Sequence, residues 1–179
     1  VIQVHLKGTF APSRHAAAYW RQLSKDRGEK VNARIINTSS TSGLYGNIGQ
    51  TNYGAAKAGI AAFTIIAARE LARIGVTVNA ISPTAYTRMT DNLREYTEED
   101  IERRDPRWVS PTIVYLSSAE AHDITGRVIQ AGNGRVAEQH RENGNARIQG
   151  FPEWHGKRGV YIAHDDRRKG GEIEEEREP

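Results

Sequence analysis

The sequence predicts an α/β fold in which helices pack on a mainly parallel sheet. Two short runs with β-branched residues, 33–38 and 76–81, are typical of strands, and the long apolar segment between them, 51–74, is typical of a helix. A further helix is expected at 108–119 and a last strand at 125–131. Strands that alternate with helices in this way are typical of βαβ units, whose strands run parallel in one sheet.

Length and composition indicate one domain with an uneven core. The chain has 179 residues, of which 37% are hydrophobic, and its mean hydropathy of −0.65 is low for a compact enzyme. Apolar residues concentrate in the first half, whereas the C-terminal segment is mostly polar. We therefore predict a folded unit over residues 1–137 and a polar, poorly ordered tail over 138–179.

Charge and composition argue against several classes of protein. The net charge is only +3, and no basic stripe is interleaved with aromatic residues, so we expect no nucleic acid partner. No apolar run reaches 18 residues and no signal peptide is visible, so we expect no membrane partner. The chain has no cysteine and its histidines are not clustered, so we expect no metal site, and a cytoplasmic location.

The first segment, residues 1–21, is predicted to be a helix because apolar side chains recur at near-helical spacing. Pro12 lies within it and is expected to kink it. Residues 22–32 are predicted to be a solvated loop leading into the strand at 33–38. A polar loop punctuated by glycines, 39–50, follows that strand.

The long helix at 51–74 is apolar nearly all round and ends at Gly75, which is a good C-cap residue. A helix of this kind must be covered on more than one face. From Gly54 to Ala68, only Lys57 and Thr64 interrupt the apolar and glycine residues. Lys57 is therefore predicted to be a lone cation in a buried element.

The segments after residue 81 are less regular. Pro83 ends the strand, residues 91–107 are highly charged, and the helix at 108–119 carries a proline in its first turn. Residues 132–137 match a Gly-x-Gly-x-x-Ala dinucleotide fingerprint in form. Because no apolar helix and second strand follow, we interpret this match as a turn after the last strand.

The spacing of Tyr53 and Lys57 points to proton transfer. Residues four apart lie on one face of a helix, one turn from each other. An ammonium close to a phenol favours the phenolate, so this pair is suited to general acid and base catalysis near neutral pH. Ser40 follows the strand, thirteen residues before Tyr53, and its hydroxyl is placed to hydrogen-bond a substrate carbonyl. Its neighbour Ser39 is interpreted as structural.

Ser40 with Tyr53-x-x-x-Lys57 resembles the active site of the short-chain dehydrogenase/reductase family. The run from Gly46 to Tyr53 and the segment Asn79-Ala-Ile-Ser-Pro83 strengthen this resemblance. Three further motifs are similar to the (R)-3-hydroxyacyl-CoA dehydrogenase unit of the type 2 multifunctional enzymes of β-oxidation: Val4-His-Leu-Lys-Gly-Thr-Phe10, Ser42-Gly-Leu-Tyr-Gly-Asn47 and Arg88-Met-Thr90. The similarity covers roughly residues 1–136.

The resemblance implies a doubly wound, Rossmann-like parallel sheet, of which this chain holds an incomplete part. The N-terminal βαβ units, which carry the glycine-rich phosphate loop, would precede the helix in which the chain opens. The first residue is Val rather than Met. We therefore expect a piece of a longer enzyme that is inactive by itself.

The resemblance also implies the reaction and the ligands. The expected parent transfers a hydride between NAD or NADP and a secondary alcohol/ketone pair, most simply a 3-hydroxyacyl/3-oxoacyl thioester. Ser40, Tyr53 and Lys57 would be catalytic, and the last two would also contact the nicotinamide ribose. His5 stands where the family carries an asparagine of the catalytic group, so it is a possible fourth catalytic residue or a packed helix residue.

Further expectations come from the same family. Pro83, Tyr86 and Thr87 would contact the nicotinamide, and residues 91–107 would form a substrate lid. A homodimer or homotetramer would assemble through helices 1–21 and 51–74. Two alternatives stay open: a ketoreductase for acyl-carrier-protein thioesters, steroids or sugars, and a non-enzymatic member that keeps the fold as an oligomerisation module.

Overall fold

The computed structural model describes residues 1–91, 95–142 and 145–150, and within them it contains one five-stranded sheet. The strands follow one another across the sheet in chain order, with the first three parallel and the last two joined antiparallel. Their bounds are Ala33–Thr38 (β1), Val76–Pro83 (β2), Val128–Gly132 (β3), Arg135–Glu142 (β4) and Asn145–Gly150 (β5).

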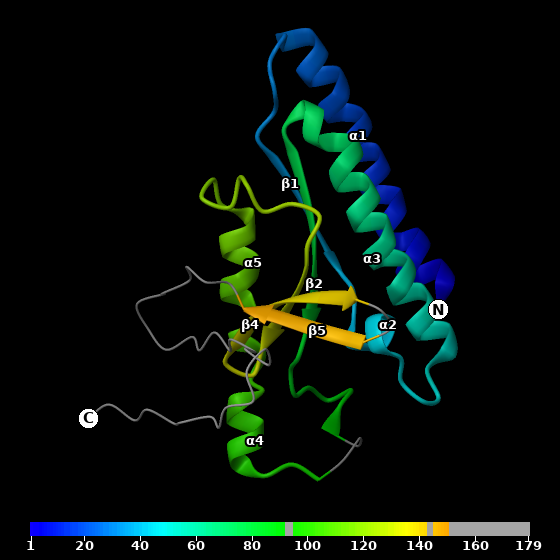
Figure 1. The fold of residues 1–179 in the computed structure, drawn as a ribbon, viewed down its shortest axis with the longest axis vertical. Coiled ribbons are helices and arrows are strands. Elements are labelled where there is room, and N and C mark those ends of the chain that lie inside the picture. Colours follow the sequence, from blue (N-terminus) through cyan, green and yellow to red (C-terminus); the bar gives the residue numbers. More distant parts are fainter. Residues whose placement is uncertain (92–94, 143–144, 151–179) are drawn as a thin grey trace, which may run out of the picture.

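Helices lie on both faces of the sheet. Figure 1 shows α1 and α3 side by side on one face and α5 on the other. The helix bounds are Gly8–Arg27 (α1, preceded by a π-helical stretch Gln3–Lys7), Thr41–Tyr45 (α2), Thr51–Leu71 (α3), Glu98–Arg103 (α4) and Ser110–Ser117 (α5). Short 3-10 turns follow α3 at Ala72–Ile74 and precede α5 at Pro106–Trp108. This is the α/β, Rossmann-like arrangement that the sequence predicts.

The core is divided by the sheet because successive strand residues point to opposite faces. Val76 and Val78 of β2 pack against the apolar face of α3, whereas Ile81 packs with Leu116 of α5 and Ile129 of β3. Every residue of β2 except its last is buried. A central strand covered on both faces explains why the whole segment is rich in apolar residues.

The first helix is longer than predicted. Residues 22–27, expected to be part of a loop, continue α1 to Arg27, and Gly28 ends it with a left-handed φ of 67°. The segment carries no glycine or proline before Gly28, so nothing in it breaks the helix. Pro12 lies inside α1, and its i−4 residue is Gly8, where the π-helical stretch gives way to α1.

The sheet also extends further than predicted. The strand expected to be last is followed by β4 and β5, so ordered structure continues past residue 137 to Gly150. The fingerprint-like stretch is the hairpin turn between β3 and β4, in which Asn133 and Gly134 both have positive φ. Such Asn-Gly turns match the twist of two paired strands. The remainder of the predicted tail, 151–179, lies outside the described residues.

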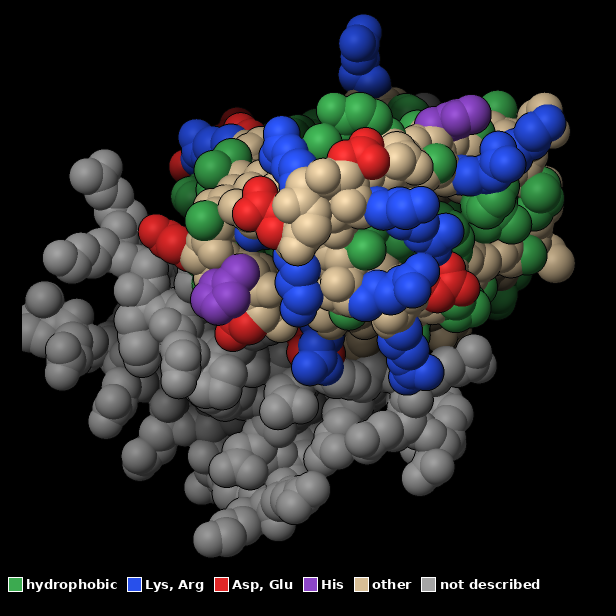
Figure 2. Space-filling model, turned by 90° about the horizontal axis from the view of Figure 1, so that it is seen from above, with side chains coloured by type: hydrophobic (Ala, Val, Ile, Leu, Met, Phe, Trp, Pro, Cys, Tyr) green, Lys and Arg blue, Asp and Glu red, His purple; other side chains and the backbone are tan. Residues whose placement is uncertain are grey.

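Within the residues that the structure describes, no helix combines the length and the hydropathy needed to cross a bilayer. Figure 2 views the end of the molecule where α1 ends, and basic and acidic side chains are mixed there. That end is opposite the carboxyl ends of β1 and β2 (Figure 1).

Candidate active site

The polar residues singled out in the sequence meet where β1 ends and α3 begins. In a parallel sheet, ligands bind beyond the carboxyl ends of the strands. There the chain leaves β1, forms the short helix α2, turns, and enters α3 through Thr51 (Figure 1). Ser40 caps α2, and Tyr53 and Lys57 occupy the first two turns of α3.

Tyr53 and Lys57 are neighbours, as their spacing predicts. The Lys57 ammonium nitrogen lies 5.5 Å from the centre of the Tyr53 ring. The π-helical stretch at the start of the chain adds His5, whose ring meets the Tyr53 ring edge-on with 5.3 Å between the ring centres. The phenol therefore has a cation and an imidazole beside it.

Lys57 is buried although it carries a charge, with 6% of its surface exposed. Its ammonium donates a hydrogen bond of 2.8 Å to the main-chain oxygen of Thr38, the last residue of β1. Burial lowers the pKa of Lys57 below its ordinary value. The sequence prediction of a lone buried cation in α3 is confirmed.

His5 is half-buried beside the same group. Its pKa is lowered by loss of solvation and also by the positive charge of Lys57. The imidazole is therefore neutral near pH 7. A neutral imidazole offers one donor and one acceptor, so it suits a polar role next to the phenol.

The two serines after β1 differ in their surroundings. Ser40 is half-buried, and its hydroxyl oxygen accepts a 3.2 Å hydrogen bond from the Ser42 amide. Ser39 is 1% exposed, and its hydroxyl donates a 2.9 Å hydrogen bond to the Lys57 main-chain oxygen. Of the two, only Ser40 reaches the surface of the site.

The loop before α3 is braced internally. The Ser42 hydroxyl donates to the Gln50 side-chain oxygen at 2.8 Å, and the Gln50 amide donates to the Asn47 carbonyl at 3.1 Å. Asn47 and Gln50 therefore hold the shape of the loop. The helical turn α2 was not predicted, because Gly43 and Gly46 indicate a loop when the sequence is considered alone.

The expected nicotinamide contacts lie at the end of β2 and on the segment that follows it. Pro83 is the last residue of β2 and is exposed. Tyr86 packs edge-on against Tyr96, with 5.0 Å between the ring centres, and the Thr87 amide donates to the Thr90 hydroxyl. In the described part of the chain, no hydrogen bond or ring contact joins these three to Ser40, Tyr53 or Lys57.

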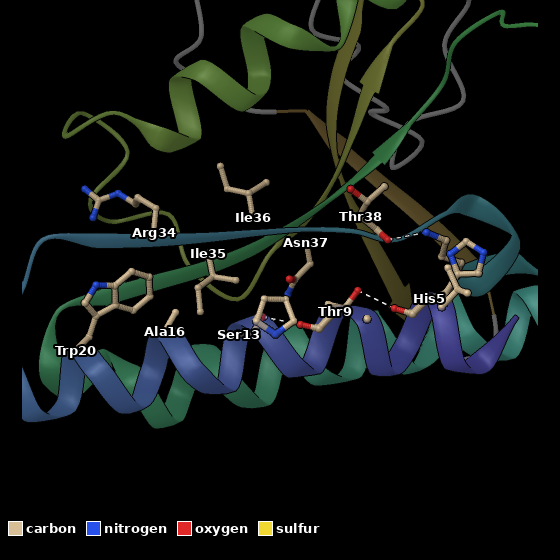
Figure 3. Close-up of a pocket in the computed structure, with 14 residues that line it drawn as sticks. His5, Thr9, Ser13, Ala16, Trp20, Arg34, Ile35, Ile36, Asn37 and Thr38 are labelled. Carbon is tan, nitrogen blue, oxygen red and sulfur yellow. Dashed lines mark hydrogen bonds between the residues drawn. The ribbon is translucent and has the colours of Figure 1, made fainter.

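A groove of about 510 Å³ leads away from the site along the edge of β1 that pairs with no described strand. Figure 3 shows that one wall is formed by His5 of the π-helical stretch and by Thr9, Ser13, Ala16 and Trp20 of α1, while β1 forms the other. Thr38 lies at the end of the groove nearest His5, and Lys57, whose ammonium is bonded to the Thr38 main-chain oxygen, also lines the groove. The groove was not predicted from the sequence; the small side chains at helical spacing on α1 are the signal for it.

The described residues hold no group of three or more histidine, aspartate or glutamate side chains arranged to bind a metal ion. Several acidic residues of 95–105 have partners within the segment or just after it. Thr97 and Asp100 form a capping box at the start of α4, and Glu99 pairs with Arg103 one turn later. The charged segment therefore includes a capped surface helix.

Comparison with known proteins places these features in a family. A family model described as short chain dehydrogenase matches residues 1–100. The chain is 45% identical over 133 residues to hydroxyacyl-CoA dehydrogenase ChsB1 of Mycobacterium tuberculosis, covering 72% of this chain and 42% of that protein. It is 35% identical over 150 residues to peroxisomal multifunctional enzyme type 2 of Drosophila melanogaster, covering 83% of this chain and 23% of the relative.

A solved structure shows the same relationship. The crystal structure of a short chain dehydrogenase from Mycobacterium avium is 54% identical, with a TM-score of 0.69, and the match covers 79% of this chain and 47% of that one. The chain thus spans less than half the length of each of these three proteins.

Proposed function

This chain belongs to the short-chain dehydrogenase family, and we propose that the whole protein interconverts a secondary alcohol and its ketone with a nicotinamide cofactor. The observation that carries the proposal is the Lys57 ammonium 5.5 Å from the centre of the Tyr53 ring, at the carboxyl end of a parallel sheet. A buried cation beside a phenol favours the phenolate. Few structural roles require that pairing.

The proposed roles follow from the donors and acceptors of each side chain. In the direction of oxidation, the Tyr53 phenolate accepts the hydroxyl proton of the alcohol while the carbinol carbon loses a hydride. In reduction, Tyr53 returns that proton to the ketone oxygen. The Ser40 hydroxyl donates to the same oxygen and orients it. His5, neutral beside Tyr53, is proposed as a fourth polar group that keeps the phenol correctly oriented.

The donor set suits a nicotinamide nucleoside. The nicotinamide cofactor would supply the hydride acceptor or donor. Lys57 and Tyr53 would hold its ribose hydroxyls, because an ammonium and a phenol side by side offer several donors at the strand end. Pro83, Tyr86 and Thr87, on the segment that leaves β2, are proposed to face its carboxamide. NAD and NADP are both compatible with these residues.

The proposed substrate is a 3-hydroxyacyl or 3-oxoacyl thioester. The support is the printed name of the Mycobacterium tuberculosis relative, a hydroxyacyl-CoA dehydrogenase, at 45% identity. Coenzyme A and acyl-carrier-protein thioesters share the reacting group, so both carriers belong in the assay.

A homodimer or homotetramer is proposed through residues 1–21 and 51–74. Apolar side chains on α1 and α3 are exposed: Phe10 (47%), Ile65 (39%) and Ile66 (56%). Val4, just before α1, is 72% exposed. Clustered exposed apolar residues on neighbouring helices are typical of an interface.

The experiment that tests the function is a turnover assay of the full-length protein. Reduced nicotinamide is followed by absorbance while a 3-oxoacyl-CoA or a 3-oxoacyl-carrier-protein thioester is supplied. We expect thioester-dependent oxidation of the cofactor that Tyr53→Phe abolishes. A folded oligomeric protein that turns over none of these, nor a steroid or sugar ketone, would contradict the proposal and favour an oligomerisation module.

A further inference from the structure

Two consecutive residues at the end of β1 hold Lys57 at both of its ends. The Thr38 main-chain oxygen accepts a 2.8 Å hydrogen bond from the Lys57 ammonium. The hydroxyl of the next residue, Ser39, donates a 2.9 Å hydrogen bond to the Lys57 main-chain oxygen. We call this pair of contacts, from Thr38 and Ser39 to Lys57, the strand-end clamp.

The clamp is held in place because the main chain of Ser39, just after β1, is still hydrogen-bonded to β2. The pairing of β1 with β2 places Thr38 opposite Ile81, and the Ser39 amide donates at 2.7 Å to the Ile81 carbonyl. Alternation along the strand then turns the Ser39 side chain toward α3, where it is 1% exposed. The hydroxyl therefore has little freedom to leave the Lys57 carbonyl.

Gly43 of α2 makes a second close contact with the backbone of Lys57. A Cβ atom added at Gly43 would lie 2.6 Å from the Lys57 carbonyl carbon and 2.5 Å from the Ala58 nitrogen. No side chain fits there, so α2 packs directly on the backbone of α3. Since Ser40 caps α2, this contact also sets the position of Ser40 relative to α3.

We propose that Ser39 is a positioning residue for the proton-transfer site, acting through Lys57, an inference that rests on the proposed function. The lysine side chain is a flexible stem of four carbons. Its ammonium therefore has a fixed position only when both the Lys57 backbone and the ammonium nitrogen are held by neighbours. Ser39 holds the backbone and Thr38 the nitrogen. Proton transfer is sensitive to misplacements of about 1 Å, so loosening either contact should slow it.

Ser82 offers a matched control on the neighbouring strand. The register of Thr38 with Ile81 carries forward to Ser39 and Ser82, so the two serines lie opposite each other. Ser82 is fully buried, and its hydroxyl has no hydrogen-bond partner among the described residues. Ser82→Ala therefore also removes a buried serine hydroxyl from the sheet, but it breaks no hydrogen bond to α3.

The test compares Ser39→Ala and Ser82→Ala in the full-length protein with two readouts. The first is the rate at which a small acylating reagent labels Lys57, measured by mass spectrometry of the folded protein. We expect Ser39→Ala to accelerate this labelling several-fold, because the buried ammonium gains freedom. Ser82→Ala should label like the wild type.

The second readout is turnover. We expect Ser39→Ala to lower kcat about tenfold while KM for the thioester changes little, because a misplaced ammonium slows proton transfer rather than thioester binding. A purely structural serine would lower the melting temperature and leave kcat of the folded protein unchanged. Should the alanine variant not fold, Ser39→Cys keeps a side chain of the same shape, slightly larger and with a weaker donor, and should give smaller changes in the same direction.

The outcomes separate the two proposals. Equal Lys57 labelling in both serine variants and the wild type would overturn the clamp, whatever the turnover. If Ser39→Ala is labelled faster than the wild type but the wild type turns over no substrate, the clamp stands and the proposed function is overturned instead.

Discussion

Lys57 lies one turn of α3 beyond Tyr53, with its ammonium nitrogen 5.5 Å from the centre of the tyrosine ring. The ring of Tyr53 also packs edge-on against His5. The ring thus has packing contacts of its own, and the hydroxyl is the part assigned to catalysis. A substitution that removes only the hydroxyl separates the two.

Tyr53→Phe should lower turnover by about 10²–10⁴-fold, the usual contribution of a general acid or base. The ring contacts to His5 and Lys57 remain, so the melting temperature should change by no more than a few degrees. Tyr19→Phe, on the exposed surface of α1, is the matched control and should change neither quantity. Substantial turnover by Tyr53→Phe would remove Tyr53 from the mechanism.

Lys57→Met should abolish most turnover without unfolding the protein. Burial lowers the pKa of Lys57, so at neutral pH the charged form carries a desolvation cost that methionine does not. The Thr38 carbonyl left behind belongs to an exposed residue and can bond water. We expect the free energy of unfolding at pH 7 to change by less than about 1 kcal/mol, measured by denaturant titration. A loss of several kcal/mol would mean that the ammonium is mainly structural.

His5→Asn should alter the behaviour of the protein in acid. The pKa of His5 is lowered from 6.5, so below that pH the unfolded chain binds the proton more readily than the folded one. Stability should therefore fall as the pH drops from about 6.5 through the lowered pKa, and the asparagine variant should lose less over that window. The measurement is melting temperature against pH, with the exposed His15→Asn as the control for loss of an imidazole. Identical curves for His5→Asn and the wild type would contradict the prediction.

Gly43→Ala should destabilise the site because its methyl group meets the backbone of Lys57 and Ala58. Overpacking of this kind costs about 1–3 kcal/mol, and turnover should fall with it since α2 carries Ser40. Gly8→Ala is the control, since an added Cβ there meets nothing closer than 3.9 Å. That second helical glycine should gain up to about 1 kcal/mol from the better helix propensity of alanine. Equal effects of the two substitutions would show that α2 does not press on α3.

Ile66→Asp should weaken self-association. Ile66 is 56% exposed on α3, and a carboxylate there would have to be desolvated in an interface. The oligomeric state is measured by sedimentation at several protein concentrations. Val114→Asp, which is 68% exposed on α5 across the sheet, is the control and should sediment like the wild type. An unchanged oligomer in Ile66→Asp would place the interface elsewhere.

Local patterns carry most of what can be predicted from this sequence. The strand at 33–38, the C-cap at Gly75 and the approach of Lys57 to Tyr53 follow from neighbours within a few residues, where periodicity and turn chemistry decide. The family resemblance depends on the same short motifs. The end of α1 was placed too early because the polar residues 22–27 read as solvated loop, although no helix breaker stands before Gly28.

The strands β4 and β5 show a limit of the same reasoning. Their sequence is polar and lacks the alternation of a buried strand, so composition suggested a tail. Pairing of β4 with β3 and of β5 with β4 gives the backbone hydrogen bonds that stabilise these strands. The side-chain pattern does not indicate that pairing. An edge hairpin needs less apolar surface than a central strand.

The sequence by itself determined the first three strands, the long helix α3, the buried lysine and the family, because each depends on residues close together in the chain. Only the tertiary structure decided that His5 meets Tyr53, that Ser39 holds the Lys57 carbonyl and that Gly43 seats α2 on α3. These contacts join segments far apart in sequence. They depend on strand register and on how closely the helices approach, which no local pattern encodes.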